Sequence, residues 1–293
     1  MAALFHRIVT AAALSIGLTV QCKAGTLLMT PIPQPSGVSP KILNGQIATQ
    51  SDWPATLQFS TDDGSQCTGT IVGERAIVTA AHCVYDNSEG RVLLNNKLIH
   101  VSCTHHPDYD DRPIKANGLF CHQRIDPTEI AACTADIALC VTDPGTSFPT
   151  MAGRFERIKS IKPGPAAKQS IFLLGYGCTV SGGAVSDVLN IGSATIRRTS
   201  TPGASKNPNN SYLEFIQTMG AAVCDGDSGG AAYSNKEPSS REIIGINSRG
   251  NISSTSYLVN VLDPKITAFL RDFSAQNIIR LCGLDNRAAN CTF

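Results

Sequence analysis

The sequence has almost no net charge and no long hydrophobic run beyond its first 20 residues. The formal charge is +1, so neither nucleic acid nor an anionic membrane surface is expected as a main partner. No later apolar run approaches the roughly 20 residues of a spanning helix, and no internal repeat is present. What remains is a chain of 293 residues, 42% hydrophobic, long enough for one large β-type domain or two small ones.

Eleven cysteines are a high count, and the N-terminus helps to interpret them. Arg7 precedes an apolar stretch over residues 8–20, which is typical of a signal peptide. We expect residues 1–24 to be removed; acylation of Cys22, as in a lipoprotein, is the less favoured alternative. Loss of Cys22 leaves ten cysteines, which fits five disulfides. The sequence therefore predicts secretion to an extracellular or periplasmic compartment.

Residues 25–41 are rich in proline and serine and favour an extended segment that forms no core. The sequence Lys41-Ile42-Leu43-Asn44-Gly45 follows. It is either the simple start of the fold or a processing site that frees Ile42. We expect a propeptide over 25–41, a folded domain over 42–273, and a C-terminal extension over 274–293 in which Cys282 and Cys291 close a small loop.

Short apolar runs separated by turn residues fill the middle of the chain. They lie near residues 55–59, 69–72, 76–79, 172–174, 213–216, 243–246 and 257–261. Many short strands with glycine and proline between them predict an all-β barrel or sandwich. One helix is expected, with Asp263 as its N-cap, Pro264 as its first residue, and Ile266, Leu270 and Phe273 at helical spacing.

Residues 86–125 are more polar and hold four of the six histidines, which predicts strands with an enlarged surface loop. Zinc is an alternative there, through Cys103, His105, His106, Cys121 and His122. The even cysteine count favours disulfides instead, so no metal or other cofactor is expected. Cys103, Cys121, Cys133 and Cys140 allow three pairings.

The segment Gly226-Asp227-Ser228-Gly229-Gly230 places a serine between glycines. A serine hydroxyl becomes a good nucleophile when a base takes its proton, and histidine suits that role near neutral pH. A carboxylate then holds the imidazole in the correct tautomer. Glycines let a substrate approach the main chain, so that backbone N–H groups converge on a developing oxyanion.

No histidine follows Ser228. This excludes the α/β-hydrolase nucleophile elbow, which the motif also matches, because that fold requires serine, acid and histidine in that order. His82 follows an apolar strand, and Asp136 begins another, which gives the order histidine, aspartate, serine. A bridge from Cys67 to Cys83 would close a loop of about 16 residues, stabilise the fold by about 3 kcal/mol, and fix the backbone beside His82.

The segments 76–83, 136–139 and 226–230 together resemble the three active-site blocks of the trypsin/chymotrypsin family of serine proteases. Residues 42–45 resemble the activated N-terminus of that family. The resemblance implies two six-stranded antiparallel β-barrels with the active site between them, plus a C-terminal α-helix. It also implies a serine endopeptidase made as a zymogen, acting on protein or peptide substrates, and a monomer is expected.

The resemblance assigns roles to individual residues. His82, Asp136 and Ser228 would form the catalytic triad, and the N–H groups of Gly226 and Ser228 the oxyanion hole. A buried Asp227 would need a cationic partner. That partner would be the α-ammonium of Ile42, released by an activating protease that cuts after Lys41.

The resemblance places Ala222 at the base of the primary specificity pocket, where a neutral, small residue predicts cleavage after an apolar or aromatic residue. Gly250 would form an open wall and Ser256 the back, with Ser248 and Asp225 also contacting substrate. Residues 247–260 lack the cysteine that usually pairs with the one before the nucleophile, so Cys178 is the favoured partner of Cys224. A catalytically silent binding protein on the same scaffold is the alternative function.

Overall fold

The structure is a computed structural model that describes Ile42, Cys291 and residues 45–61, 64–86, 88–94, 97–110, 135–148, 155–199 and 215–285. The chain divides into the units Met1–Val38 and Ser39–Phe293, and every described residue belongs to the second. The expected signal peptide and propeptide, and also Cys121, His122 and Cys133, lie outside the described residues. Within the described ranges, no helix has the length and hydrophobicity needed to cross a membrane.

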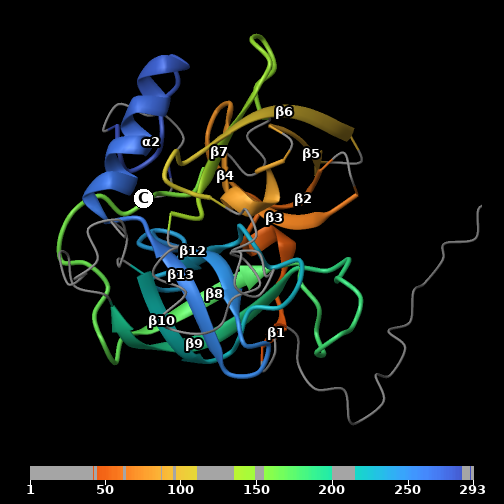
Figure 1. Ribbon diagram of the computed structural model, residues 1–293, viewed down its shortest axis with the longest axis vertical. Coiled ribbons are helices and arrows are strands. Elements are labelled where there is room, and N and C mark those ends of the chain that lie inside the picture. Colours follow the sequence, from red (N-terminus) through yellow and green to blue (C-terminus); the bar gives the residue numbers. More distant parts are fainter. Residues whose placement is uncertain are drawn as a thin grey trace, which may run out of the picture. The chain divides into compact units, whose positions relative to one another are not determined.

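Six antiparallel strands form the first barrel, closed in the order β2-β3-β4-β7-β6-β5 (Figure 1). The bounds are β2 Thr56–Ser60, β3 Gln66–Gly73, β4 Ala76–Thr79, β5 Glu89–Leu94, β6 Lys97–His105 and β7 Ala138–Thr142. Side chains alternate between barrel interior and solvent along β6, where Ile99, Val101 and Cys103 are the buried ones. This period of two is typical of a strand with one buried face.

The second barrel closes in the order β9-β10-β13-β12-β11-β8, because β8 also pairs with β9. A seventh strand, β1, adds to β9 at its edge. The bounds are β1 Gln46–Ile47, β8 Ser170–Gly175, β9 Asn190–Thr199, β10 Phe215–Gly220, β11 Ala231–Tyr233, β12 Ile243–Gly250 and β13 Thr255–Asn260. The prediction of two six-stranded antiparallel barrels is confirmed.

The C-terminal helix α2, Pro264–Gln276, has the N-terminus that the sequence predicts. The Asp263 carboxylate accepts hydrogen bonds from the backbone N–H groups of Lys265 and Ile266, at 2.7 and 3.3 Å. This satisfies two donors that the first helical turn leaves without intrahelical partners. Ile266, Leu270 and Phe273 are buried, as their spacing predicts.

The segment after α2 packs into the fold rather than extending away from it. Leu281 and Cys282 are fully buried, and the Cys282 N–H donates to the carbonyl of Val72 on β3 at 2.8 Å. Cys282 is bonded to Cys291, which forms a parallel bridge with Phe155. The packed structure therefore continues well beyond residue 273, because the tail pairs with the segment that links the barrels.

Disulfides also connect elements within the barrels. Cys103 on β6 bonds to Cys140, its cross-strand partner on β7. This resolves one of the pairings that the sequence leaves open. It also removes the Cys103 thiolate from the alternative zinc cluster, whose members Cys121 and His122 lie outside the described residues.

Candidate active site

The loop 226–230 connects β10 to β11 and is held by bonds to several elements. Gly226 has φ +96°, a conformation that L-residues with side chains rarely adopt. The N–H of Gly229 donates to the carbonyl of Asn247 on β12 at 2.8 Å. The carbonyl of Ser228 accepts from the N–H of Thr68 on β3, also at 2.8 Å. Both barrels therefore fix the loop, and Ser228 remains partly exposed on it.

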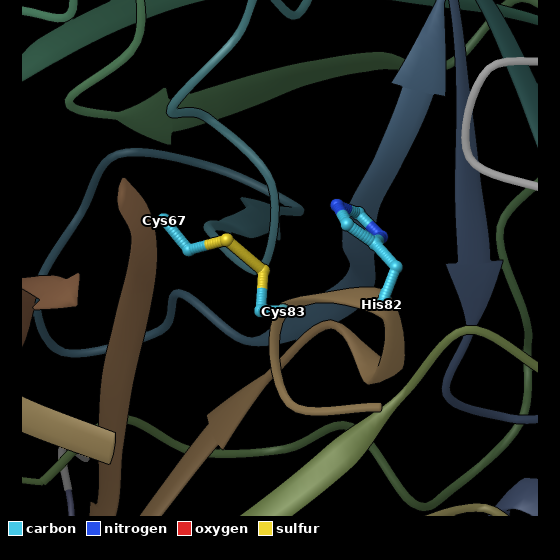
Figure 2. A group of neighbouring side chains, drawn as sticks. All are labelled: Cys67, His82 and Cys83. Atoms are coloured by element: carbon cyan, nitrogen blue, oxygen red, sulfur yellow. A yellow bond between two sulfur atoms is a disulfide. The ribbon is translucent and has the colours of Figure 1, made fainter. Parts of the chain in front are cut away.

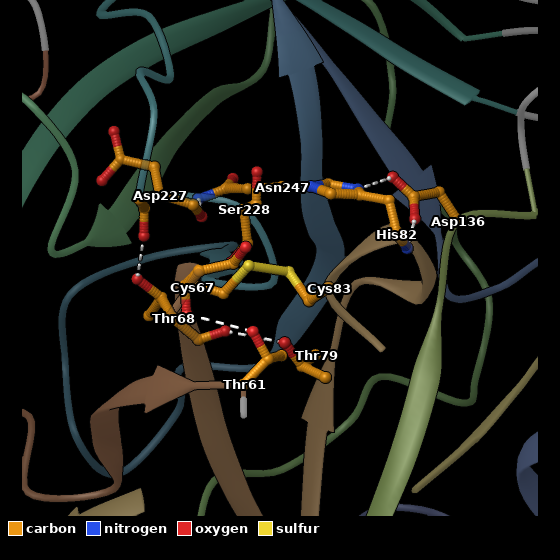
Figure 3. Close-up of a disulfide and its surroundings, with 12 residues drawn as sticks. Thr61, Cys67, Thr68, Thr79, His82, Cys83, Asp136, Asp227, Ser228 and Asn247 are labelled. Atoms are coloured by element: carbon orange, nitrogen blue, oxygen red, sulfur yellow. Dashed lines mark hydrogen bonds and ion pairs between the residues drawn. A yellow bond between two sulfur atoms is a disulfide. The ribbon is translucent and has the colours of Figure 1, made fainter. Parts of the chain in front are cut away.

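Thr68 is a contributor that the sequence analysis missed. Its side chain is fully buried, and its hydroxyl donates to the carbonyl of Gly226 at 2.7 Å. The same oxygen accepts from the N–H of Tyr176 at 3.0 Å. Figure 3 shows Thr68 on the strand directly below the loop that carries Ser228. Adjacency to Cys67 is the only signal in the sequence that points to this residue.

His82 lies in a 3₁₀ turn, η2 Ala81–Cys83, directly after β4. Its Nδ1 is 2.7 Å from Oδ2 of Asp136, and its backbone N–H donates to Oδ1 of the same carboxylate at 2.8 Å. Two bonds to one carboxylate fix both the ring and the backbone. In Figure 3 the ring is drawn with Asp136 on one side and Ser228 on the other.

Asp136 is fully buried and remains a strong acid. Burial alone raises its pKa, but the charge and hydrogen bond of His82 outweigh burial, with help from Arg249 and from the Ser248 hydroxyl. The pKa is thereby lowered to about 2. The Ser248 hydroxyl donates to Oδ2 at 2.6 Å. Ser248, expected at the substrate, thus contacts the carboxylate that orients His82.

Cys67 and Cys83 form a disulfide beside His82, and Figure 2 shows the three residues together. The sulfurs of Cys67 and Cys83 and a ring nitrogen of His82 form the one cluster of at least three possible metal ligands within the described part of the chain. Because both sulfurs are in a disulfide, neither is available as a metal-binding thiolate. The bridge instead ties β3 to the turn that carries His82. The Cys83 sulfur is 3.9 Å from the Ser228 carbonyl.

The backbone N–H groups of Gly226 and Ser228 differ from those of the neighbouring residues in their hydrogen bonding. The N–H groups of Asp227, Gly229 and Gly230 all donate to carbonyl oxygens. Within the described residues, the N–H groups of Gly226 and Ser228 donate to no protein group. Two unsatisfied donors, flanking one residue in a rigid loop, are a suitable arrangement for binding an oxyanion.

Asp227 is turned into the second barrel and is fully buried. Its carboxylate accepts from the N–H groups of Gly177 and Cys224 at 2.8 and 2.9 Å. A Cβ on Gly177 would lie 2.3 Å from the Asp227 carboxyl carbon, so glycine is required for this approach. Burial raises the pKa of Asp227 to about 7, and the two hydrogen bonds lower it only in part. No ion pair to Asp227 is present among the described residues.

Ile42 is fully buried in the core cluster of the second barrel, together with Ala221, Ala194 and other small or branched residues. A Cβ on Gly192 would be 3.0 Å from Cγ2 of Ile42. The backbone of Ile42 has φ +50°. That value is a genuine outlier for a β-branched residue.

The residues expected around the specificity pocket lie on three segments. Ala222 and Ser256 are fully buried, Gly250 is half-buried, and Asp225 is exposed. A Cβ at position 250 would lie 2.6 Å from the carbonyl oxygen of Thr255 and 3.1 Å from Cγ2 of Val223, so this position is closely packed and favours glycine. Cys178 is bonded to Cys224.

Comparisons with known proteins show which family the sequence resembles. The sequence model of the family described as Trypsin matches residues 42–264. A trypsin from Saccharopolyspora erythraea is 26% identical over 224 residues, covering 71% of this chain and 86% of that protein. Trypsin Blo t 3 from Blomia tropicalis is 28% identical over 205 residues, covering 66% and 72%. A crystal structure of Rv3671c protease in its inactive form aligns with a TM-score of 0.48 at 17% identity, covering 82% and 96%.

Proposed function

Because the chain belongs to the trypsin family, we propose that it is a serine endopeptidase that works through an acyl-enzyme. The observation that carries the proposal is the His82–Asp136 pair, 2.7 Å apart, facing the loop that bears Ser228. A buried carboxylate with a pKa of about 2 stays ionised at neutral pH. It can therefore stabilise an imidazolium while His82 accepts and returns a proton.

In this mechanism the Ser228 hydroxyl attacks the peptide carbonyl while His82 takes its proton. The developing oxyanion accepts hydrogen bonds from the N–H groups of Gly226 and Ser228. His82 then protonates the leaving amine, and a water molecule hydrolyses the ester on Ser228 by the same steps. These roles follow the general template of the family. The two unused N–H donors and the hydrogen-bonded His82 support their transfer to this chain.

The chain is proposed to be a zymogen that becomes active when a protease cuts after Lys41. Asp227 supports this, since a buried carboxylate without an ionic partner among the described residues is costly. The α-ammonium of Ile42 would supply that partner. Ile42 supports it too: its φ of +50° exists only while the Lys41–Ile42 bond is intact. Cutting that bond relieves backbone strain on the order of 1–3 kcal/mol.

The proposal also covers export and specificity. Four disulfides among the described residues support a secreted enzyme, because such bonds persist in oxidising compartments. Residues 1–24 would direct export, and 25–41 would be the activation segment. Ala222 carries no charge to pair with lysine or arginine, which supports cleavage after an apolar or aromatic residue. Asp225, Gly250 and Ser256 complete the proposed pocket.

The test is covalent labelling of the activated protein with a serine-directed organophosphonate. The wild type should be labelled at Ser228 and should cleave peptides, and Ser228→Ala should lose both properties while remaining folded by circular dichroism. Ser193→Ala, on the exposed side of β9, is the matched control and should retain both. Absence of label on the folded, activated wild type would favour the silent binding scaffold.

A further inference from the structure

Strand β12 has a one-residue bulge beside the candidate active site. In its pairing with β13 the register shifts between Asn247 and Arg249, so Ser248 is the extra residue. A bulge leaves the extra residue out of the ladder and re-aims its side chain. Here the Ser248 hydroxyl donates to Oδ2 of Asp136 at 2.6 Å. Arg249 follows directly along the backbone, which places a cationic residue next to the one that bonds Asp136.

Arg249 also ends a row of polar side chains that crosses four strands of the second barrel. Successive register partners across β9, β10, β13 and β12 are Arg198, Gln217, Tyr257 and Arg249. Directly opposed residues of antiparallel strands have their side chains on the same face of the sheet. Nε of Arg198 donates to Oε1 of Gln217 at 2.6 Å, and Nε2 of Gln217 donates to the Tyr257 hydroxyl at 3.3 Å. The row therefore leads from an exposed arginine on β9 to a buried one beside the active site.

The charge of Arg249 is held away from solvent. The residue has an exposed fraction of only 5%, and Asp136 is fully buried. Charges interact more strongly in such surroundings because the effective dielectric constant is lower than in water. The attraction of Arg249 is accordingly one of the causes that lower the pKa of Asp136. A cation that favours this carboxylate also opposes a second cation on His82.

Two further histidines lie at the end of β6, in the same barrel as Asp136, but their rings face other groups. The ring of His105 packs on Tyr85 and that of His106 on Phe269 of α2, with centroids 5.2 and 5.1 Å apart. The charged side chains that act on Asp136 within the described residues are His82 and Arg249.

We propose that Arg249 is a positioning residue of this enzyme, whose buried charge acts through Asp136 to disfavour a proton on His82 and so extends activity to lower pH. This inference rests on the proposed endopeptidase function and deepens it. His82 must be uncharged to accept the proton of Ser228. A neutral residue at position 249 would let His82 hold a proton at higher pH, and activity would then be lost at higher pH.

The size of the effect follows from the range of the charge. An ion within about 4–6 Å of a titrating group moves its ionisation by about 1–3 pH units. Arg249 acts on His82 across Asp136, at longer range, so a smaller effect is expected. Removal of the charge should raise the midpoint of the acid limb of kcat/KM by at least about 0.5 pH unit.

The experiment measures kcat/KM between pH 5 and pH 9 on one uncharged fluorogenic peptide, so that the substrate itself does not titrate. Activated wild type is compared with Arg249→Met and Arg249→Gln, which remove the charge, and with Arg249→Lys, which keeps it. Arg197→Met, at an exposed position of β9, is the matched control. Asp227 is present in every sample and contributes alike to all profiles.

The acid limb should move to higher pH in Arg249→Met and Arg249→Gln, and it should stay in place in Arg249→Lys and Arg197→Met. A lower kcat/KM with an unmoved midpoint in the uncharged variants would overturn the inference, because a purely structural role changes the level and not the midpoint. Loss of folding in both uncharged variants, seen by circular dichroism, would overturn it too. Organophosphonate labelling of Ser228 is recorded on every sample. A labelled enzyme with an unmoved midpoint refutes only the role of Arg249, whereas a folded, activated wild type without label refutes the proposed function itself.

Discussion

Substitution of Asp227 tests the activation proposal through the stability of the uncut chain. Asp227 is fully buried with a pKa of about 7 in the folded protein, compared with an ordinary value of 3.8. The folded state therefore binds more protons than the unfolded state between those two values. The contribution of Asp227 to the stability of the fold is fully present below about pH 4 and is lost as the pH rises through about 7.

The expected magnitude follows from that rise in pKa. About 1.4 kcal/mol accompanies each tenfold change in an ionisation constant, so the full loss is on the order of 4 kcal/mol. Between pH 5 and pH 8 the free energy of unfolding should fall by roughly 3 kcal/mol, because part of the full loss has already occurred at pH 5. A cation beside Asp227 would remove most of this loss. That is the change that cleavage after Lys41 should produce.

The assay is urea unfolding at pH 5 and pH 8. Lys41→Gln keeps the chain uncut, and it is compared with the Lys41→Gln/Asp227→Asn double variant. The uncut chain should lose roughly 3 kcal/mol more of its free energy of unfolding over this range than the double variant. Asp187→Asn, at an exposed position, is the matched control and should change nothing.

Equal pH dependence with and without Asp227 would refute the reasoning. So would an activated chain, inactivated by Ser228→Ala, that loses as much stability as the uncut one. Asn at position 227 leaves one backbone donor poorly paired, which lowers stability at both pH values alike. The difference between the two pH values is therefore the reading that matters.

Two further substitutions test residues that hold the site and the fold. Thr68→Val removes the hydroxyl that bonds Gly226 and Tyr176. Steady-state kinetics should therefore show a kcat about 10-fold lower with KM little changed, whereas Thr68→Ser should retain activity. An unchanged kcat would contradict the positioning role. Arg241→Met leaves Glu156 buried without the guanidinium it pairs with, and urea unfolding should show a loss of about 3–5 kcal/mol. Adding Glu156→Gln should restore part of that loss, and no restoration would argue against the ion pair as the cause.

The sequence could predict the features that rest on local patterns. The α2 start depends on Asp263 and Pro264, which lie next to the apolar positions they precede. The strands with strong apolar runs, such as β4 and β12, were also predictable. The 3₁₀ turn that carries His82 follows β4 without an intervening loop, so its place at a strand end was readable from the sequence.

Features that depend on distant partners were not predictable. β9 was missed, since its buried positions include small residues such as Ala194 and two consecutive residues near its end, Arg197 and Arg198, are charged and exposed. The ion pair of Arg241 with Glu156 joins segments 85 residues apart. Each charge in isolation predicts a solvated surface position. Only the fold brings them together and places Arg241 over the Trp53 ring, at 4.0 Å.

The pocket and the nucleophile loop are not independent parts of this molecule. Cys224 donates its N–H to the Asp227 carboxylate, and the preceding residue, Val223, donates its own to Ser256. The Asp227 carboxylate and the Ser256 hydroxyl therefore hold two neighbouring residues of one segment. Because the same short segment bears the two N–H groups proposed for the oxyanion hole, its geometry must satisfy rate and selectivity together. A neutral Asp227 weakens the bond to Cys224, whereas an ionised one paired with a cation strengthens it. Activation by cleavage is thus expected to set both the reactivity of Ser228 and the position of the backbone at Cys224.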